Sequence, residues 1–249
     1  MHEIFLFSID KRHEIWYNNK RNLSLLKGTV KNLIKAAIFD FDGTLANTLP
    51  DLKITINLTR GTYGLPPVTE DDVLLHVNNH MPVFIRRMIP ELNDEALWDE
   101  ALQRYYAFYD DHYLSETVPY PGIPEILAKL KKNGVKLAVM SNKNHSHITK
   151  MVAALFPDAF DCAWGTIPEV PAKPNPARAF LIAEELELDI SEIAYIGDSD
   201  LDMITACNAK AIPIGVAWGY RPADVLRANG AVYTPATADE LYRVLESLS

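Results

Sequence analysis

Short apolar runs alternate with amphipathic, helix-like stretches through the second half of the chain. Strands are expected at 135–140, near 161–164, at 193–196 and at 212–216, and helices at 123–133, 145–155, 176–186, 200–208 and 238–248. Apolar runs bounded by turn residues are typical of buried strands. Their regular alternation with helices predicts a Rossmann-like α/β core, a parallel sheet that helices cover on both faces.

Residues 49–118 show no strand-like alternation and are predicted to be mostly helical. One helix is expected to begin at Thr48-Leu49-Pro50-Asp51 and another at Thr69-Glu70-Asp71-Asp72, because proline and acidic residues favour the first turn. An aromatic-rich stretch from about 93 to 114 continues the helical pattern. We therefore expect a helical cap at 49–118, inserted into a core formed by residues 35–48 and 119–249.

Residues 1–34 precede the first clear core strand, and the sequence assigns them no function. Two interpretations stay open, a docking appendage or a start site placed too early. The apolar beginning is interrupted by Asp10-Lys11-Arg12 and no small-residue cleavage site follows, so a signal peptide is not expected.

Composition narrows the class of protein. The chain has 249 residues, 48% of them hydrophobic, which suits a globular protein with a full core. Its formal net charge of −9 argues against sequence-independent nucleic-acid binding, and no apolar run is long enough to span a bilayer. Two distant cysteines give no disulfide framework. We expect a cytoplasmic protein without nucleic-acid or membrane partners; its oligomeric state stays open.

Three expected strands end in polar residues that suit catalysis. The run at 36–39 leads into Asp40-Phe41-Asp42-Gly43-Thr44-Leu45, the second into Ser141-Asn142-Lys143, and the third into Gly197-Asp198-Ser199-Asp200-Leu201-Asp202. A lysine, Lys173, precedes Pro174-Asn175-Pro176 in a loop before a helix. In open α/β sheets ligands bind at the carboxyl ends of strands. One such end would be an ordinary polar turn, but three at one edge predict an active site.

At these residues the chain resembles the haloacid dehalogenase superfamily, most closely its phosphoglycolate phosphatase group. Four elements match in order: the acids from Asp40, the serine at 141, the lysine at 173, and the acids Asp198 and Asp202. The similarity extends to Gly64-Leu65-Pro66-Pro67 and Trp218-Gly219-Tyr220-Arg221 and covers residues 35–249. It implies the fold of that superfamily, with a cap over the site, and a Mg²⁺-dependent phosphatase that hydrolyses a small phosphorylated metabolite.

The acids then take distinct expected roles. Asp40 is the candidate nucleophile, which forms an aspartyl phosphate, and Asp42 is the candidate acid and base that protonates the leaving alcohol and activates water. Mg²⁺ prefers oxygen ligands, so Asp40 and Asp198 are candidate metal ligands. The resemblance adds the backbone carbonyl of Asp42 as a third ligand. Asp202, one turn beyond Asp198, is expected to position a metal-bound water or Lys173.

The remaining candidates concern the phosphate and the leaving group. Lys173 is expected to steady both nucleophile and phosphate, and the candidate phosphate and substrate contacts are Ser141, Gly43, Thr44, Asn142 and Arg86. Arg86, in the insert, can bind a substrate carboxylate in bidentate fashion, with an exposed surface position as the alternative. His76 and His80 have helical spacing but no evident third ligand, so a zinc site is not expected.

Two departures from the phosphoglycolate phosphatase pattern bear on the substrate. Asn47-Thr48 replaces a common Asp-Ser pair, and Val77-Asn78-Asn79-His80 replaces a common Val-Gly-x-Gly where the cap approaches the substrate. The first should spare the chemistry, whereas the second bears on phosphoglycolate as the substrate. Two other functions stay open: a sugar phosphomutase of the same superfamily, and a non-enzymatic binding relative, whose expected mark would be loss of the site residues.

Overall fold

A computed structural model describes residues 34–77 and 79–249, so the expectations for residues 1–33 lie outside the described part. Its centre is a sheet in the order β5-β4-β1-β6-β7, in which every neighbouring pair is parallel. The strands are β1 (Ala36–Phe39), β4 (Lys136–Asn144), β5 (Cys162–Thr166), β6 (Ile193–Gly197) and β7 (Ile212–Gly215). The predicted parallel α/β core is confirmed.

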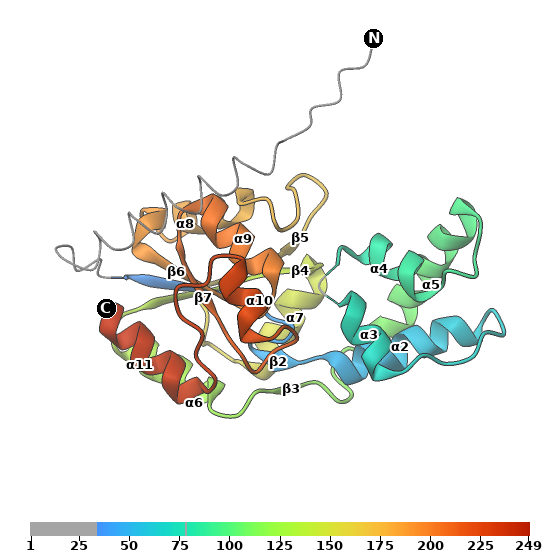
Figure 1. Ribbon diagram of the computed structural model, residues 1–249, viewed down its shortest axis with the longest axis horizontal. Coiled ribbons are helices and arrows are strands. Elements are labelled where there is room, and N and C mark those ends of the chain that lie inside the picture. The colour runs from blue at the N-terminus through green and yellow to red at the C-terminus, as the bar shows by residue number, and fades with distance from the viewer. Residues whose placement is uncertain (1–33, 78) are drawn as a thin grey trace, which may run out of the picture. The chain divides into compact units, whose positions relative to one another are not determined.

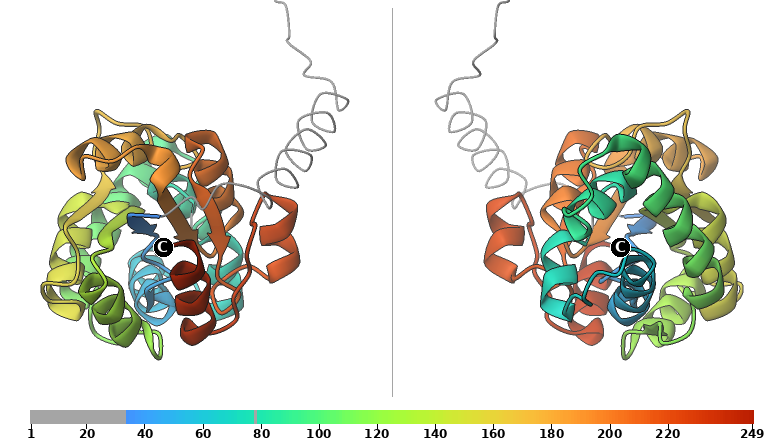
Figure 2. Two further views of the ribbon diagram at one scale, coloured as in Figure 1. Left: turned by 90° about the vertical axis from the view of Figure 1, so that its left-hand side faces the viewer. Right: turned by 90° about the vertical axis from the view of Figure 1, so that its right-hand side faces the viewer.

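Helices cover both faces of this sheet, as Figure 1 and Figure 2 show. One face carries α6 (Ile123–Lys132), α7 (His145–Leu155) and α11 (Ala238–Leu248), and the other carries α8 (Ala177–Glu185) and α9 (Asp200–Ala209). In β1, Ala37 and Phe39 pack toward the first layer, whereas Ala36 and Ile38 pack toward the second. Because alternate side chains of a strand face opposite ways, a strand covered on both faces must be apolar throughout.

The expected helical insert lies between β2 (Ala46–Asn47) and β3 (Val118–Pro119), two short strands that pair antiparallel. It consists of α2 (Leu49–Gly61), α3 (Glu70–His76), α4 (Met81–Met88) and α5 (Glu95–His112). These helices have an apolar core of their own, separate from the two clusters on the sheet. The chain thus enters and leaves the cap through one two-stranded ribbon at the edge of the core.

A buried carboxylate ties the two ends of the cap together. Asp51, in the first turn of α2, accepts hydrogen bonds from the backbone N–H groups of Glu116 (2.9 Å) and Thr117 (3.0 Å) and from the Thr117 hydroxyl (2.7 Å). Because Asp51 is fully buried, these three donors replace its hydration. They fix the direction in which α2 leaves the core.

Several elements differ from the sequence expectation. The helix that begins at the Thr69–Asp72 capping box ends at His76, where Val77 turns extended, and α4 starts anew with a proline in its first turn. Strand β4 continues past Met140 to Asn144 with a register shift between these two residues. A short helix, α10 (Ala223–Ala228), and a 3₁₀ turn, η1 (Ile190–Glu192), were not predicted. Within residues 34–77 and 79–249, no helix combines the length and the apolar character that a bilayer crossing requires.

Candidate active site

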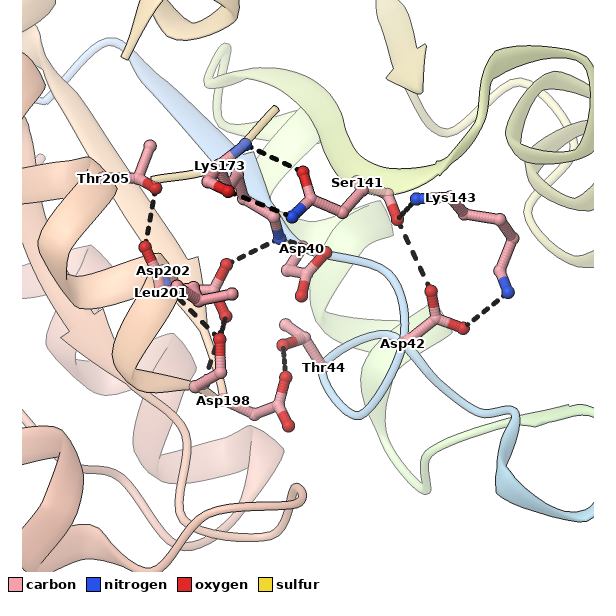
Figure 3. Close-up of polar contacts among 12 residues, drawn as sticks. Asp40, Asp42, Thr44, Ser141, Lys143, Lys173, Asp198, Leu201, Asp202 and Thr205 are labelled. Carbon is pink, nitrogen blue, oxygen red and sulfur yellow. Dashed lines mark hydrogen bonds and ion pairs between the residues drawn. The ribbon is translucent and has the colours of Figure 1, made fainter. Parts of the chain in front are cut away.

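The carboxyl ends of β1, β4 and β6 meet at one edge of the sheet, as expected. Figure 3 shows Asp40, Asp42, Ser141, Lys173 and Asp198 around this edge, and all five are buried. Four structural elements bring them there: the loop after β1, the irregular end of β4, the end of β6, and the loop before α8. A bulged strand end re-aims side chains, which turns Ser141 toward the acids.

Lys173 joins two buried acids. Its Nζ lies 2.7 Å from Asp40 Oδ1 and 2.7 Å from Asp202 Oδ1. Burial by itself lowers the pKa of Lys173, but the charges of Asp202 and Asp40 outweigh burial and raise that pKa well above its ordinary value. Burial, followed by the charge of Asp202, raises the pKa of Asp40, which the charge of Lys173 opposes. One lysine therefore does not balance the acids around it, and the site favours a further cation.

The acids at this edge fit a metal ion. Carboxylate oxygens of Asp40, Asp198 and Asp202 lie within 4.8 Å of one another, and all three residues are buried. Burial and the charge of Asp202 raise the pKa of Asp198 to about 7. Asp40 Oδ1 has the Lys173 ammonium beside it but no partner in hydrogen-bond geometry. Desolvated carboxylates with free acceptor capacity are the ligands that a hard divalent cation requires.

Asp202 is held by groups of its own. Its Oδ2 accepts hydrogen bonds from the Ser199 N–H (3.0 Å) and hydroxyl (2.5 Å), while Oδ1 accepts one from Lys173. Ser199 in turn caps α9, so the pair forms a capping box. With both oxygens engaged, Asp202 is placed to hold Lys173, one of the two roles that the sequence had suggested.

Asp42 faces a different set of partners from Asp40. Its Oδ1 accepts a hydrogen bond from the Thr48 hydroxyl (2.5 Å) and lies 3.1 Å from Lys143 Nζ, and its Oδ2 lies 3.4 Å from the Ser141 hydroxyl. Lys143 also donates to the hydroxyl of Tyr109 on α5 (2.8 Å). In the sequence, Lys143 stands out only as the last residue of Ser141-Asn142-Lys143. Its position two residues after Ser141, on the same bulged strand end, was the available signal.

Asn142 lines the cavity at this edge, and its side chain also holds a loop together. Its Oδ1 accepts hydrogen bonds from the Lys173 N–H (2.8 Å) and Arg178 Nη2 (2.7 Å), and its amide donates to the Lys173 carbonyl (3.3 Å). Arg178, fully buried on α8, also donates to the Ser141 carbonyl. Asn142 and Arg178 together fix Lys173 relative to Ser141. Arg178 stands inside an ordinary helical pattern, so no local signal marks it.

The glycine loop after Asp42 is closed by its own backbone hydrogen bonds. The Gly43 N–H donates to the Ala46 carbonyl (3.0 Å) and the Thr44 N–H to the Phe41 carbonyl (3.3 Å), so both backbone donors close the loop. The Thr44 hydroxyl donates to Asp198 (3.0 Å). Gly43 has a φ of 79°, and a Cβ there would lie 2.3 Å from Asp198 Oδ2. The loop thus requires glycine for close packing against Asp198.

Arg86 does not reach this site. It is exposed on α4, pairs with Glu95 and lies 5.2 Å from the centre of the Trp98 ring. The outward face of α4 explains this position, since Phe84, Ile85 and Met88 on the same helix are buried. Within the described ranges, the metal-suited group contains neither His76 nor His80.

Known proteins resemble this chain in sequence and in fold. The family described as haloacid dehalogenase-like hydrolase matches residues 37–216. A phosphoglycolate phosphatase of Pasteurella multocida is 32% identical over 73% of this chain and 85% of its own length, and one of Neisseria meningitidis is 30% identical over 86% and 94%. A solved structure from Lactobacillus delbrueckii subsp. bulgaricus has a TM-score of 0.80 at 30% identity, covering 85% of this chain and 98% of that one. The chain therefore belongs to the haloacid dehalogenase-like hydrolases and is an enzyme of their phosphoglycolate phosphatase-like group.

Proposed function

We propose that the chain hydrolyses a small phosphomonoester with Mg²⁺ as cofactor, through an aspartyl phosphate on Asp40. The observation that carries this proposal is the contact of Asp40 with Lys173 inside a buried acid cluster, with a second acid, Asp42, held apart from it. The names of the curated relatives, phosphoglycolate phosphatases, support a phosphorylated small molecule as substrate.

In the first step a carboxylate oxygen of Asp40 attacks phosphorus, and the bond from phosphorus to the ester oxygen breaks. Asp42, protonated at the start, gives its proton to the departing oxygen. Ser141 donates a hydrogen bond to the phosphoryl group, and Lys173 offsets its charge. In the second step Asp42, now a carboxylate, takes a proton from water, which attacks phosphorus, frees inorganic phosphate and restores Asp40.

Asp40, Asp198 and the backbone carbonyl of Asp42 would hold Mg²⁺. When bound, the ion offsets phosphate charge and orients the phosphoryl group for in-line attack. Asp202 keeps Lys173 beside Asp40 and so preserves the balance of charge around the nucleophile. The all-oxygen ligand set favours a hard divalent ion such as Mg²⁺ over softer metals that prefer nitrogen or sulfur ligands.

The alternatives are less well supported. A sugar phosphomutase would pass the phosphoryl group on, whereas the relatives compared above are named as phosphatases. A binding protein without activity would be expected to lose Asp40, Lys173 or the metal acids, and all are present.

Within the described residues both cysteines, Cys162 and Cys207, are free, which suits a reducing compartment such as the cytoplasm.

The test is phosphate release from a generic aryl phosphate by the wild type and by Asp40→Asn. The wild type should release inorganic phosphate with Mg²⁺ and stop when the metal is chelated. Asp40→Asn should show no turnover, because the amide is a far weaker nucleophile than the carboxylate. Turnover that survives Asp40→Asn would remove Asp40 as the nucleophile, and a rearranged sugar phosphate instead of free phosphate would favour the mutase.

A further inference from the structure

The active-site cavity has two unlike sides. Its core side carries Asp40, Asp42, Ser141, Lys143 and Lys173. Its cap side consists of Leu52 on α2, Met81 and Phe84 on α4, and Val77 before α4. We call these four residues the cap wall. Among the described cap residues, one polar side chain, that of Asn79, also lines the cavity. The part of a substrate that extends away from the phosphate would therefore meet apolar carbon and one amide.

Two arginines of the cap are engaged elsewhere. Arg60 is buried against Glu91, 2.8 Å away, and donates to the Met88 carbonyl, and Arg86 pairs with Glu95 outside the cavity. None of the cavity-lining side chains contributed by described cap residues is cationic. A carboxylate on the leaving group would find no arginine or lysine among the described residues that line the cap side.

The two lysines of the core do not fill this gap. Lys143 contacts Asp42 and Tyr109, and Lys173 contacts Asp40 and Asp202. With Asp42 protonated for the first step, three buried carboxylates face two ammonium groups, so the site carries an excess of one negative charge before a divalent cation binds. A phosphate dianion then restores negative charge, and an additional carboxylate would be repelled and desolvated without a partner.

We propose that the alcohol part of the substrate is uncharged and mainly apolar, with at most one hydrogen-bonding group for Asn79, and that phosphomonoesters bearing a carboxylate there are poor substrates. This inference rests on the proposed function, because it assumes that the phosphoryl group occupies the core side. The proposed preference would distinguish this chain from an enzyme whose substrate is phosphoglycolate.

The test compares three esters at equal Mg²⁺: phosphoglycolate, its neutral amide 2-phosphoglycolamide, and butyl phosphate. The amide matches the carboxylate in shape, so the ratio of their kcat/KM values isolates the effect of charge. We expect kcat/KM for the amide to exceed that for phosphoglycolate by about tenfold or more, and butyl phosphate to exceed both, since an unpaired buried group is strongly disfavoured. Phosphoglycolate equal to or better than its amide would overturn the inference while leaving phosphatase activity intact.

A wrong assignment of the proposed function would give a different experimental result. If neither these esters nor an aryl phosphate is hydrolysed, the phosphatase assignment falls and this inference falls with it. Activity on the esters that is equal in the wild type and in Asp40→Asn would reject the proposed mechanism, whatever the order of the three substrates.

A cation placed in the cavity should largely abolish the preference for the amide. Met81 is half-buried, so Met81→Lys can extend its ammonium into the cavity while its stem packs against the cap wall. We expect the ratio of phosphoglycolate to amide turnover to rise about tenfold. Asn79→Lys should act in the same direction, and Val83→Lys, on the exposed side of the same helix, should leave the ratio unchanged. An unchanged ratio in both Met81→Lys and Asn79→Lys would overturn the contact between cap wall and leaving group.

Discussion

The two sides of one cavity are held in place by different forces. On the core side the charged groups have close, directional partners: Lys173 contacts two acids, and Asp42 contacts Thr48 and Lys143. On the cap side, the cap wall packs within the apolar core of α2 to α5, or beside it in the case of Met81. Hydrogen bonds and ion pairs fix an atom in direction and distance, whereas apolar packing fixes mainly shape and volume.

This difference separates reaction from selection. A displaced carboxylate on the core side removes a step of the reaction, so substitutions there should have large, all-or-none effects. A changed side chain in the cap wall alters the fit of the leaving group, and a methylene in an apolar pocket changes rates by about 10- to 200-fold. The core side should therefore vary little among enzymes with this chemistry, and the cap wall should vary with the substrate.

On the core side, Asp42→Asn gives the largest expected effect after Asp40→Asn. The amide keeps the size of the side chain, and its oxygen can still accept the Thr48 bond, but it can neither donate nor accept the transferred proton. Proton transfer of this kind contributes about 10²- to 10⁴-fold, so kcat should fall by about 10³-fold. Steady-state release of phosphate from an aryl phosphate measures the loss.

A neighbouring acid supplies the control. Asp200 lies half-buried in the first turn of α9, close in sequence to Asp198 and Asp202. Asp200→Asn makes the same chemical change and should keep kcat within a few-fold of the wild type. If both variants lose activity equally, general loss of acidic charge, and not proton transfer by Asp42, would explain the result.

The sequence predicted the core side far better than the cap side. Asp40, Asp42, Ser141 and Lys173 each stand at a strand end or before a helix, so local signals placed them at one edge. The cap wall has no such signal, because Leu52 and Phe84 look like any buried helix residue. Which face of a helix borders a cavity depends on packing between distant segments, and Arg86 was misplaced for that reason.

Asn142, Gly43 and Thr44 show a related limit. They were expected to contact the phosphate or the substrate, and that expectation stays a prediction. In the structure the Asn142 side chain and the N–H groups of Gly43 and Thr44 satisfy the loops that carry the catalytic side chains. Buried polar backbone must find partners, and a sequence does not show which loop will claim them.

Lys143 tests the boundary between the two sides, since it contacts Asp42 in the core and Tyr109 in the cap. Lys143→Met leaves Asp42 without its cation, and we expect kcat to fall about 10- to 100-fold with a smaller change in KM, because a charged hydrogen bond is worth about 1.5–3 kcal/mol. Tyr109→Phe removes only the cap contact and should lower kcat about fivefold, as expected for about 1 kcal/mol. Steady-state kinetics on an aryl phosphate separate the two.

Lys143→Arg serves as the conservative control and should recover part of the activity, since it keeps the charge near Asp42. A role limited to folding would show as equal losses in all three variants, in step with their thermal stability. An unchanged kcat in Lys143→Met would remove Lys143 from the positioning of Asp42.

The smallest expected effect concerns the packing of cap on core at His147. The ring of His147 on α7 is buried among Tyr106, Tyr109 and Tyr113 of the cap segment, with Asp110 Oδ1 2.9 Å from its Nε2. Burial lowers the pKa of His147 from 6.5, assisted by the charges of Lys143 and Lys150, while the hydrogen bond and charge of Asp110 oppose the shift. This junction of cap and core, formed by His147 and the three tyrosines, therefore favours the neutral form of the His147 ring.

A lowered pKa makes this junction sensitive to acid. The unfolded chain protonates His147 near pH 6.5 and the folded chain only at lower pH, so the unfolded state binds more protons as pH falls below that value, and stability declines. The Tm advantage of the wild type over His147→Gln should shrink between pH 7.5 and 5.5, by about 2–4 °C for each kcal/mol lost. Asp110→Asn should steepen the decline, because Asp110 raises the pKa of His147. An advantage that grows as pH falls would show that the folded junction binds the proton, and that charge pairing with Asp110, rather than neutral aromatic packing, holds the cap to the core.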